Sequence, residues 1–129
     1  MSSFDHAVLC LMWSSTDAEG NPLDSLDVDL TPEAERRLMC DWATFTEQAE
    51  RLGFDPDEHS ARMLHPDCEG DPWAAVAHDW ILTRNCHGTG FWEQGRWAGP
   101  WGQLLTQLCR QQGEIYADVD AEAGKVHLI

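Results

Sequence analysis

The sequence predicts an α+β domain in which three to four helices pack on a small antiparallel sheet that includes a C-terminal hairpin. Helix-start signals precede apolar residues at helical spacing, and residues 114–129 alternate as paired strands do. The length of 129 residues suits one domain with one core. We therefore expect residues 1–129 to form a single acidic domain, loop-rich at 14–31 and 54–71.

The first two helices are predicted from capping signals. FDHAVLCLMW, residues 4–13, could be a helix or a buried strand, but Ser3 as a cap and Asp5 in the first turn favour a helix. A second helix starts at Thr31-Pro32-Glu33, with a capping threonine and a proline at the first position. Its apolar stripe, which ends before a glycine, is Ala34, Leu38, Trp42, Phe45, Ala49 and Leu52.

Two further helices follow the same logic. Asp71-Pro72 repeats the start signal and predicts a helix that runs to about Thr83. Gly99-Pro100 opens the next helix, and Gly113 closes it. The apolar faces expected on these two helices are Trp73, Val76, Ala77, Trp80 and Ile81 on the first, and Trp101, Leu104, Leu105, Leu108 and Cys109 on the second.

The tail EIYADVDAEAGKVHLI predicts the hairpin. Ile115, Ala117 and Val119 alternate with polar neighbours, and Ala123-Gly124 lies near the expected turn. Because a lone hairpin is marginally stable, it must pack on the helices or pair with a third strand. The short segment Gly90-Phe91-Trp92 is the strand that we expect to pair with it.

Charge gives the first indication of function. The net charge is −15; residues 1–71 hold 17 acids and 4 arginines, whereas residues 72–129 hold 6 acids and 4 basic residues. The N-terminal half is therefore predicted to be the acidic pole. Such a chain lacks the basic stripe of nucleic-acid binding proteins, and its field attracts basic surfaces. The charge either serves solubility or imitates nucleic acid for a basic partner, through an acidic face of Asp17, Glu19, Asp24, Asp27 and Asp29.

Other features exclude whole classes of protein. No apolar run reaches the roughly 18 residues of a membrane span, and acids flank the run from Ala7 to Trp13, unlike a signal peptide. Five cysteines at wide spacings, without a CxxC pair, are interpreted as reduced thiols. We expect an intracellular protein that needs no cofactor.

The segment HDWILTRNCHGTGFW, residues 78–92, concentrates the candidate binding residues His78, Asp79, Arg84, Asn85 and His87. On a helix over 73–83, His78, Asp79 and Leu82 are expected to point away from the Trp73/Trp80 stripe or toward its edge. In a structural interpretation, Asp79 or a nearby carboxylate pairs with Arg84, His87 donates to a backbone carbonyl, and Asn85 holds the turn. Such a network fixes how a helix meets a strand.

Three other interpretations of this segment stay open. A catalytic one takes His87 as base, Asp79 as its orienting group, and Thr83 or Cys86 as nucleophile. A small-ligand pocket would use Arg84 to hold an anion. A metal site would draw on His65, Cys68, His78, Cys86 and His87, although adjacent Cys86 and His87 rarely bind one ion together. We expect no metal and favour a protein that is not an enzyme.

Tryptophans are dense after this segment, at Trp92, Trp97 and Trp101. Most such residues belong to a core. If Trp92 and Trp97 were exposed, they would instead mark a protein interface, because tryptophan concentrates binding energy there.

Two motifs together resemble those of small uncharacterised proteins encoded by tailed bacteriophages and prophages. These are WSSTDAEGNPLD, residues 13–24, and HDWILTRNCHGTGFW, residues 78–92, in matching order and spacing. The chain departs from that pattern at Trp80-Ile81, Cys86 and Thr89, and its segment 55–71 is longer. The similar proteins have no cysteine at the position of Cys86. This difference counts against a cysteine nucleophile and against a metal site shared by the family. The resemblance implies an accessory phage protein in the cytoplasm of the bacterial host cell, and it carries over no catalytic residue.

Two functional hypotheses follow. The first is a protein that binds a host or phage protein with a basic surface, in its sharpest form a nucleic-acid mimic that inhibits a host defence complex, such as an anti-CRISPR protein, or a nucleic-acid-handling complex. The second is a small-molecule or nucleotide-binding module, enzymatic or not, built on residues 78–87. A structural role in the virion is less favoured, because the chain has no coiled-coil or repeat pattern.

Overall fold

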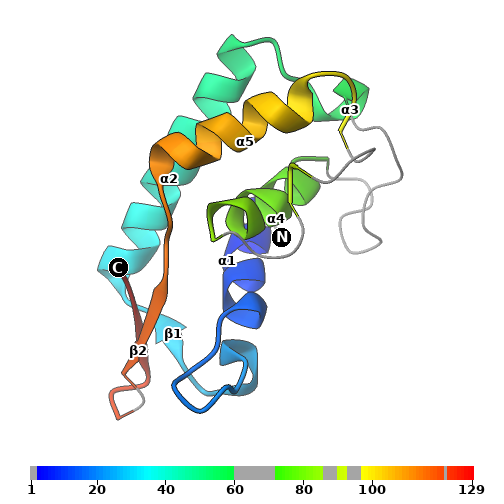
Figure 1. Ribbon diagram of the computed structural model, residues 1–129. Coiled ribbons are helices and arrows are strands. Elements are labelled where there is room, and N and C mark those ends of the chain that lie inside the picture. Colours follow the sequence, from blue (N-terminus) through cyan, green and yellow to red (C-terminus); the bar gives the residue numbers. More distant parts are fainter. Residues whose placement is uncertain (1–2, 60–71, 86–89, 93–96, 121) are drawn as a thin grey trace.

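The computed structural model describes residues 3–59, 72–85, 90–92, 97–120 and 122–129. Within these ranges it contains five α-helices, one 3₁₀ turn and three strands, which confirms the α+β class (Figure 1). In chain order they are α1 (Ser3–Ser14), η1 (Leu23–Ser25), β1 (Asp29–Leu30), α2 (Pro32–Arg51), α3 (Pro56–His59), α4 (Pro72–Arg84), α5 (Trp101–Gln112), β2 (Ala117–Asp120) and β3 (Lys125–Leu128).

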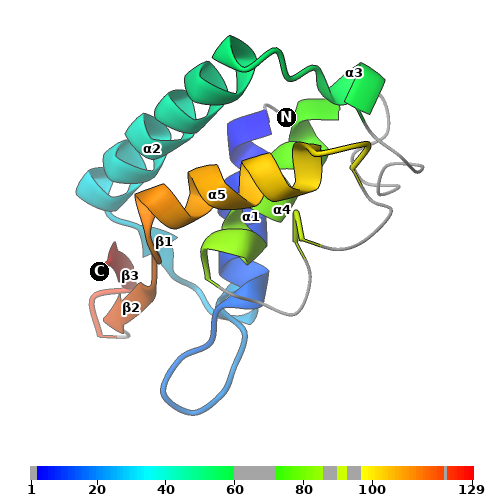
Figure 2. The ribbon, with the colours of Figure 1, turned by 45° about the horizontal axis from the view of Figure 1, so that its top comes forward.

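The helices pack mainly on one another. α1 lies along α4, and α5 packs against both α2 and α4. Figure 2 shows α5 passing in front of α1, α2 to the upper left of it, and the sheet beside the N-terminal end of α2. The sheet contacts α2 through β1 and β3, so it covers one end of the helical layer rather than forming its floor.

The longest helix, α2, forms for the reasons its sequence predicts. Thr31 Oγ1 accepts a hydrogen bond from the backbone N–H of Ala34 at 3.1 Å, which caps the helix. The predicted stripe is buried at every position except Leu52, which is 53% exposed. Leu52 lies just beyond the last helical residue, and Gly53 then turns the chain at φ +94°.

α4 is buried almost all round, which corrects the expected orientation of two residues. Asp79 and Leu82 were predicted to lie away from the core or at its edge, and each is 1% exposed. The reason is that α4 lies between α1 and α5, so both sides of the helix are covered. Trp80, fully buried, contacts the α2 stripe, with its ring 5.2 Å from that of Trp42 and 6.0 Å from that of Phe45.

The sheet is mixed, in the order β1-β3-β2. The predicted hairpin is present: β2 pairs antiparallel with β3, and Val119 lies opposite Val126. The prediction that Gly90-Phe91-Trp92 forms the third strand is wrong. The third strand is β1, which pairs with β3 in parallel, while Phe91 lies in a turn. Phe91 instead packs on Phe45, with ring centroids 5.7 Å apart.

The segments expected as loops contain short elements. Residues 14–31 include η1, β1 and an isolated bridge between Thr16 and Pro22. Residues 54–71 begin with α3, whose Pro56 is buried. The remainder of that segment, 60–71, lies outside the described residues.

Candidate functional site

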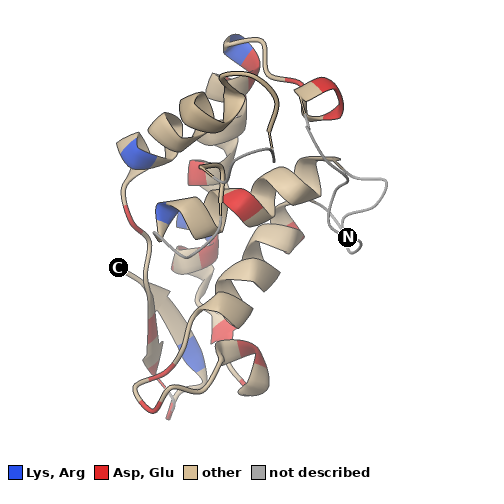
Figure 3. Cartoon of the chain, turned by 45° about the vertical axis from the view of Figure 1, so that its right-hand side comes forward, with Lys and Arg blue, Asp and Glu red and all other residues tan. Residues whose placement is uncertain are grey.

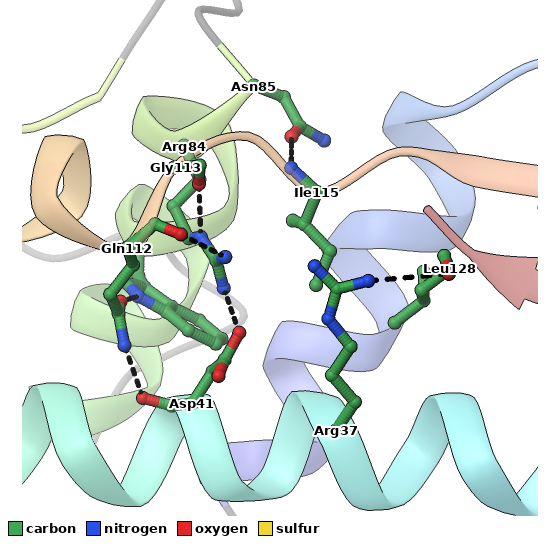
Figure 4. Close-up of polar contacts among 9 residues, drawn as sticks. Arg37, Asp41, Arg84, Asn85, Gln112, Gly113, Ile115 and Leu128 are labelled. Atoms are coloured by element: carbon green, nitrogen blue, oxygen red, sulfur yellow. Dashed lines mark hydrogen bonds and ion pairs between the residues drawn. The ribbon is translucent and has the colours of Figure 1, made fainter.

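The C-terminal end of α4 carries a buried polar network centred on Arg84 (Figure 4). Its Nη1 donates to Asp41 Oδ2 on α2 at 2.9 Å, its Nε to the Gly113 carbonyl at 2.8 Å, and its Nη2 to the Gln112 carbonyl at 3.2 Å. The guanidinium also lies 5.2 Å from the centre of the Trp80 ring. The side chain is fully buried, and all three of its nitrogens donate within the protein.

Gln112 and Asn85 extend this network. Gln112 Nε2 donates to the Asp41 carbonyl, and its Oε1 accepts from Trp80 Nε1, both at 2.7 Å. Asn85 Oδ1 accepts from the backbone N–H of Ile115 at 3.0 Å. The network therefore joins α2, α4 and the end of α5 to the residues that lead into the hairpin.

Asp79 belongs to a separate contact on another side of α4. Its Oδ2 accepts from Trp97 Nε1 at 2.8 Å, and its Oδ1 lies 3.2 Å from Nδ1 of His78. The predicted alternative partners of Arg84 were Asp79 or a nearby carboxylate, and the structure selects Asp41. Sequence reasoning missed Asp41 because it lies on the polar side of α2, 43 positions before Arg84.

These contacts bear on the catalytic and metal interpretations. Thr83 is buried, and its Oγ1 accepts from the backbone N–H of Phe91 at 2.9 Å. His65, Cys68, Cys86 and His87 lie outside the described residues. Among the residues that the structure describes, no three His, Cys, Asp or Glu side chains gather as a metal site would require. Every buried side-chain nitrogen and oxygen there has a partner, as expected of a structural network.

A small hollow of about 220 Å³ lies beside Arg84. Burial raises the pKa of the Cys109 thiol in its wall well above the ordinary range, so this thiol is not an activated nucleophile. Thr106 donates to the Gly102 carbonyl at 2.7 Å. The walls are formed by Thr83, Arg84, Trp92, Thr106, Cys109, Arg110, Gly113 and Glu114.

The two candidate interface tryptophans differ in exposure. Trp97 is 6% exposed, and its ring packs on Phe91 and Phe54 at 5.9 and 5.6 Å. Trp92 is 42% exposed and is the one available at the surface. The structure therefore does not present them as one exposed pair.

The five predicted acidic residues lie on the connection between α1 and α2. Glu19, Asp24, Asp27 and Asp29 are exposed, whereas Asp17 is half-buried. The Asp17 carboxylate accepts from the backbone N–H groups of Asn21 and Glu19, each at 2.9 Å. These bonds, that from Asn21 first, hold the pKa of Asp17 below its ordinary value.

The hairpin adds carboxylates to the same region. A surface hollow is lined jointly by residues 16–19 and by Ala117, Asp118 and Val119 of β2. We call the resulting surface the acidic end, and Lys125 is the one lysine or arginine in its segments 15–30 and 117–128. Its carboxylates are Asp17, Glu19, Asp24, Asp27, Asp29, Asp118, Asp120 and Glu122. The acidic face predicted from the sequence did not include the last three carboxylates. The alternation of the strand did, however, indicate that Asp118 lies on the opposite face from Val119.

The acids of the N-terminal half do not form a single pole. α2 runs away from the sheet, so its later acids and those of α3 lie at the opposite end of the molecule (Figure 3). We call these the far-end acids: Glu47, Glu50, Asp55, Asp57 and Glu58. Among the described residues, the acids of the predicted pole are therefore divided between the acidic end, the far end and other positions such as Asp5 and Glu35.

Comparisons with known proteins give no relative. No protein-family model matches the chain, and no curated protein or solved structure matches it significantly. In the part of the chain that the structure describes, no helix has the length and apolarity needed to cross a membrane.

Proposed function

We propose that this is an accessory phage-type protein that acts in the bacterial host cytoplasm by protein–protein binding. Its acidic end imitates nucleic acid and occupies the basic surface of a host defence complex, as an anti-CRISPR protein would, or of a nucleic-acid-handling complex. The observation that carries the proposal is the joining of two acidic segments, about one hundred positions apart, on one surface.

The order of the acidic end supports this function. The loop is held by the Thr16–Pro22 bridge and by the Asp17 carboxylate, and β1 is fixed by pairing with β3. Carboxylates held in place before binding lose little conformational freedom when a partner arrives. A dense negative field also accelerates encounter with a basic partner.

Affinity capture from a susceptible bacterium, followed by mass spectrometry, tests the proposal when paired variants are used. One variant carries Glu19→Gln, Asp24→Asn and Asp27→Asn at the acidic end. The matched control carries Glu50→Gln, Asp57→Asn and Glu58→Gln at the far end and removes the same charge. We expect the first to lose a stoichiometric partner that the control retains, and we expect duplex DNA to displace that partner.

Equal capture by both triple variants would contradict the proposal, because net charge rather than the acidic end would then be responsible. If DNA did not displace the captured partner, the part of the proposal that concerns nucleic-acid mimicry would be wrong. Loss of the partner at high salt would agree with charge-driven binding.

The alternative, a small-molecule or nucleotide-binding module on residues 78–87, has weaker support. An anion at Arg84 would have to replace contacts to Asp41, Gln112 and Gly113 that already use its three nitrogens. The hollow beside it retains Trp92 and Arg110 as exposed side chains.

A further inference from the structure

A second surface feature lies between α1, β1 and the first turn of α2. It is an open groove with an apolar floor of Val8, Leu9 and Leu30. Carboxylates from three elements line it: Asp5 of α1, Asp29 of β1 and Glu35 of α2. The groove thus combines apolar and anionic groups on one surface.

The helix that forms one wall is apolar on both of its sides. Its inner side packs on α4 through Ala7, Cys10 and Leu11, which are at most 1% exposed. Its outer side exposes Leu9 at 47% and, one turn later, Trp13 at 44%. Residues 7–13 of α1 are all apolar, and a helical segment of this kind is normally buried all round, so the exposure of Leu9 and of the part of Trp13 that His78 does not cover is unusual for it.

The charge around the groove indicates what kind of molecule would bind there. An apolar floor with a carboxylate rim complements an amphipathic helix whose apolar stripe is flanked by lysine or arginine. A second copy of this chain would bring the same three carboxylates and a net charge of −15 against the groove. An anionic lipid surface would be repelled for the same reason.

We infer that this groove receives a basic amphipathic helix of the partner protein, with leucine-like anchors placed on Val8, Leu9 and Leu30. The inference rests on the proposed function, because it takes the partner to be basic. It adds a helical shape and an apolar contact that the acidic end alone does not provide. Asp29 borders both surfaces, so the helix would lie directly beside the acidic end.

The test uses two synthetic peptides of about five helical turns and identical leucine and lysine composition. In one, the leucines recur at i, i+3, i+4 and i+7; in the other, they are scattered around the helix. Fluorescence anisotropy at about 0.15 M salt compares their binding to the intact chain and to Leu9→Gln. The control is Leu52→Gln, because Leu52 is as exposed, at 53%, but lies past the C-terminal end of α2.

We expect the patterned peptide to bind more tightly than the scattered one. Leu9→Gln is expected to weaken it roughly ten-fold, and Leu52→Gln less than about two-fold. Glu35→Gln is expected to weaken it more than Glu50→Gln, which removes the same charge from the same helix. Backbone amide shifts on peptide addition are expected to move in α1 and β1, and not in α3.

Two results would overturn the inference. One is equal binding of both peptides with no effect of Leu9→Gln; capture of a partner through the acidic end would then still stand. The other is a dimer in sedimentation that Leu9→Gln dissociates, because a second copy would then cover the groove. Conversely, the peptides could bind the groove as expected while both triple variants capture the partner equally well. That combination would refute the proposed function alone.

Discussion

The guanidinium of Arg84 and the carboxylate of Asp41 form an ion pair of unequal exposure. The nitrogen and oxygen lie 2.9 Å apart, and the arginine side chain is fully buried while that of the aspartate is 31% exposed. Removing a charge from water is costly unless hydrogen bonds replace the lost hydration. Two backbone carbonyls from the end of α5 supply them, so the pair holds α4 against α2 and α5 together.

Arg84→Met is expected to destabilise the fold by about 3 kcal/mol, as breakage of a buried pair generally does. The substitution leaves two carbonyls at the end of α5 without their donor. Urea unfolding followed by tryptophan fluorescence measures the change. Arg51→Ala is the control, because its pair with Glu47 is solvent-exposed on both sides and should not move the midpoint. Equal midpoints for the two variants would refute the structural role of Arg84.

Gly102→Ala is expected to destabilise the protein by about 1–3 kcal/mol, although alanine has a higher helix propensity than glycine. A Cβ at this position in α5 would lie 2.6 Å from the carbonyl oxygen of Phe91. Gln103→Ala, at the next and exposed position, is the matched control and should be neutral or stabilising. Thermal unfolding of both variants decides this, and a higher Tm for Gly102→Ala would show that the close approach is absent.

The thiols are expected to differ in reactivity. Cys40 is exposed, whereas Cys10 and Cys109 are buried, and burial raises the pKa of Cys109. Iodoacetamide at neutral pH should modify Cys40 in the native protein and leave Cys10 and Cys109 unmodified until denaturant is added. Mass spectrometry of the digested protein assigns each site. Modification of Cys109 at the rate of Cys40 would contradict the burial.

Replacement of Asp79 tests the contact with Trp97. Asp79→Asn retains an acceptor for the indole N–H and should cost little, whereas Asp79→Leu leaves that buried donor unpaired, at about 1–3 kcal/mol. Adding Trp97→Phe to Asp79→Leu removes the unpaired donor as well. We expect the double variant to be less destabilised in urea than the sum of the two single variants. Strict additivity would mean that the two side chains do not interact.

The turn at residues 17–21 is expected to respond to acid. The folded-state pKa of Asp17 lies below its ordinary value of 3.8, so the stabilisation that its carboxylate gives is complete above that value. It is lost as the pH falls through the lowered folded-state pKa. The amide proton shift of Asn21, followed by NMR from about pH 6 to about pH 2, should titrate below 3.8. Asp17→Asn should abolish this titration, and a midpoint above 3.8 would contradict the hydrogen bonds.

The sequence predicts an element well where its pattern is complete within the element. α2 has its cap, its proline and its buried stripe in adjacent positions, and all but one residue of that stripe are buried as expected. The hairpin likewise shows its own alternation. The C-terminal end of α4 was also predictable. Arg84, a cation that complements the helix dipole, is its last residue, and Asn85 follows it.

What could not be predicted depends on neighbours far along the chain. Asp79 occupies a polar position on α4, but α1 and α5 enclose that helix and bury the carboxylate. β1 has only two residues, too few for a strand pattern, and exists because β3 pairs with it. The acidic end was half predicted, because the approach of Asp118 to residues 16–19 is a tertiary contact.

The central position of β3 sets the order in which the sheet can assemble on the ribosome. β1 is synthesised 96 residues before the residues of β3 that it pairs with, and β2 also has β3 as its neighbour. Until Lys125–Leu128 leave the exit tunnel, the loop that carries Asp24 and Asp27 has no strand to anchor its end. The acidic end is thus completed only after most of the chain has emerged, and a nascent chain interrupted before β3 would lack it.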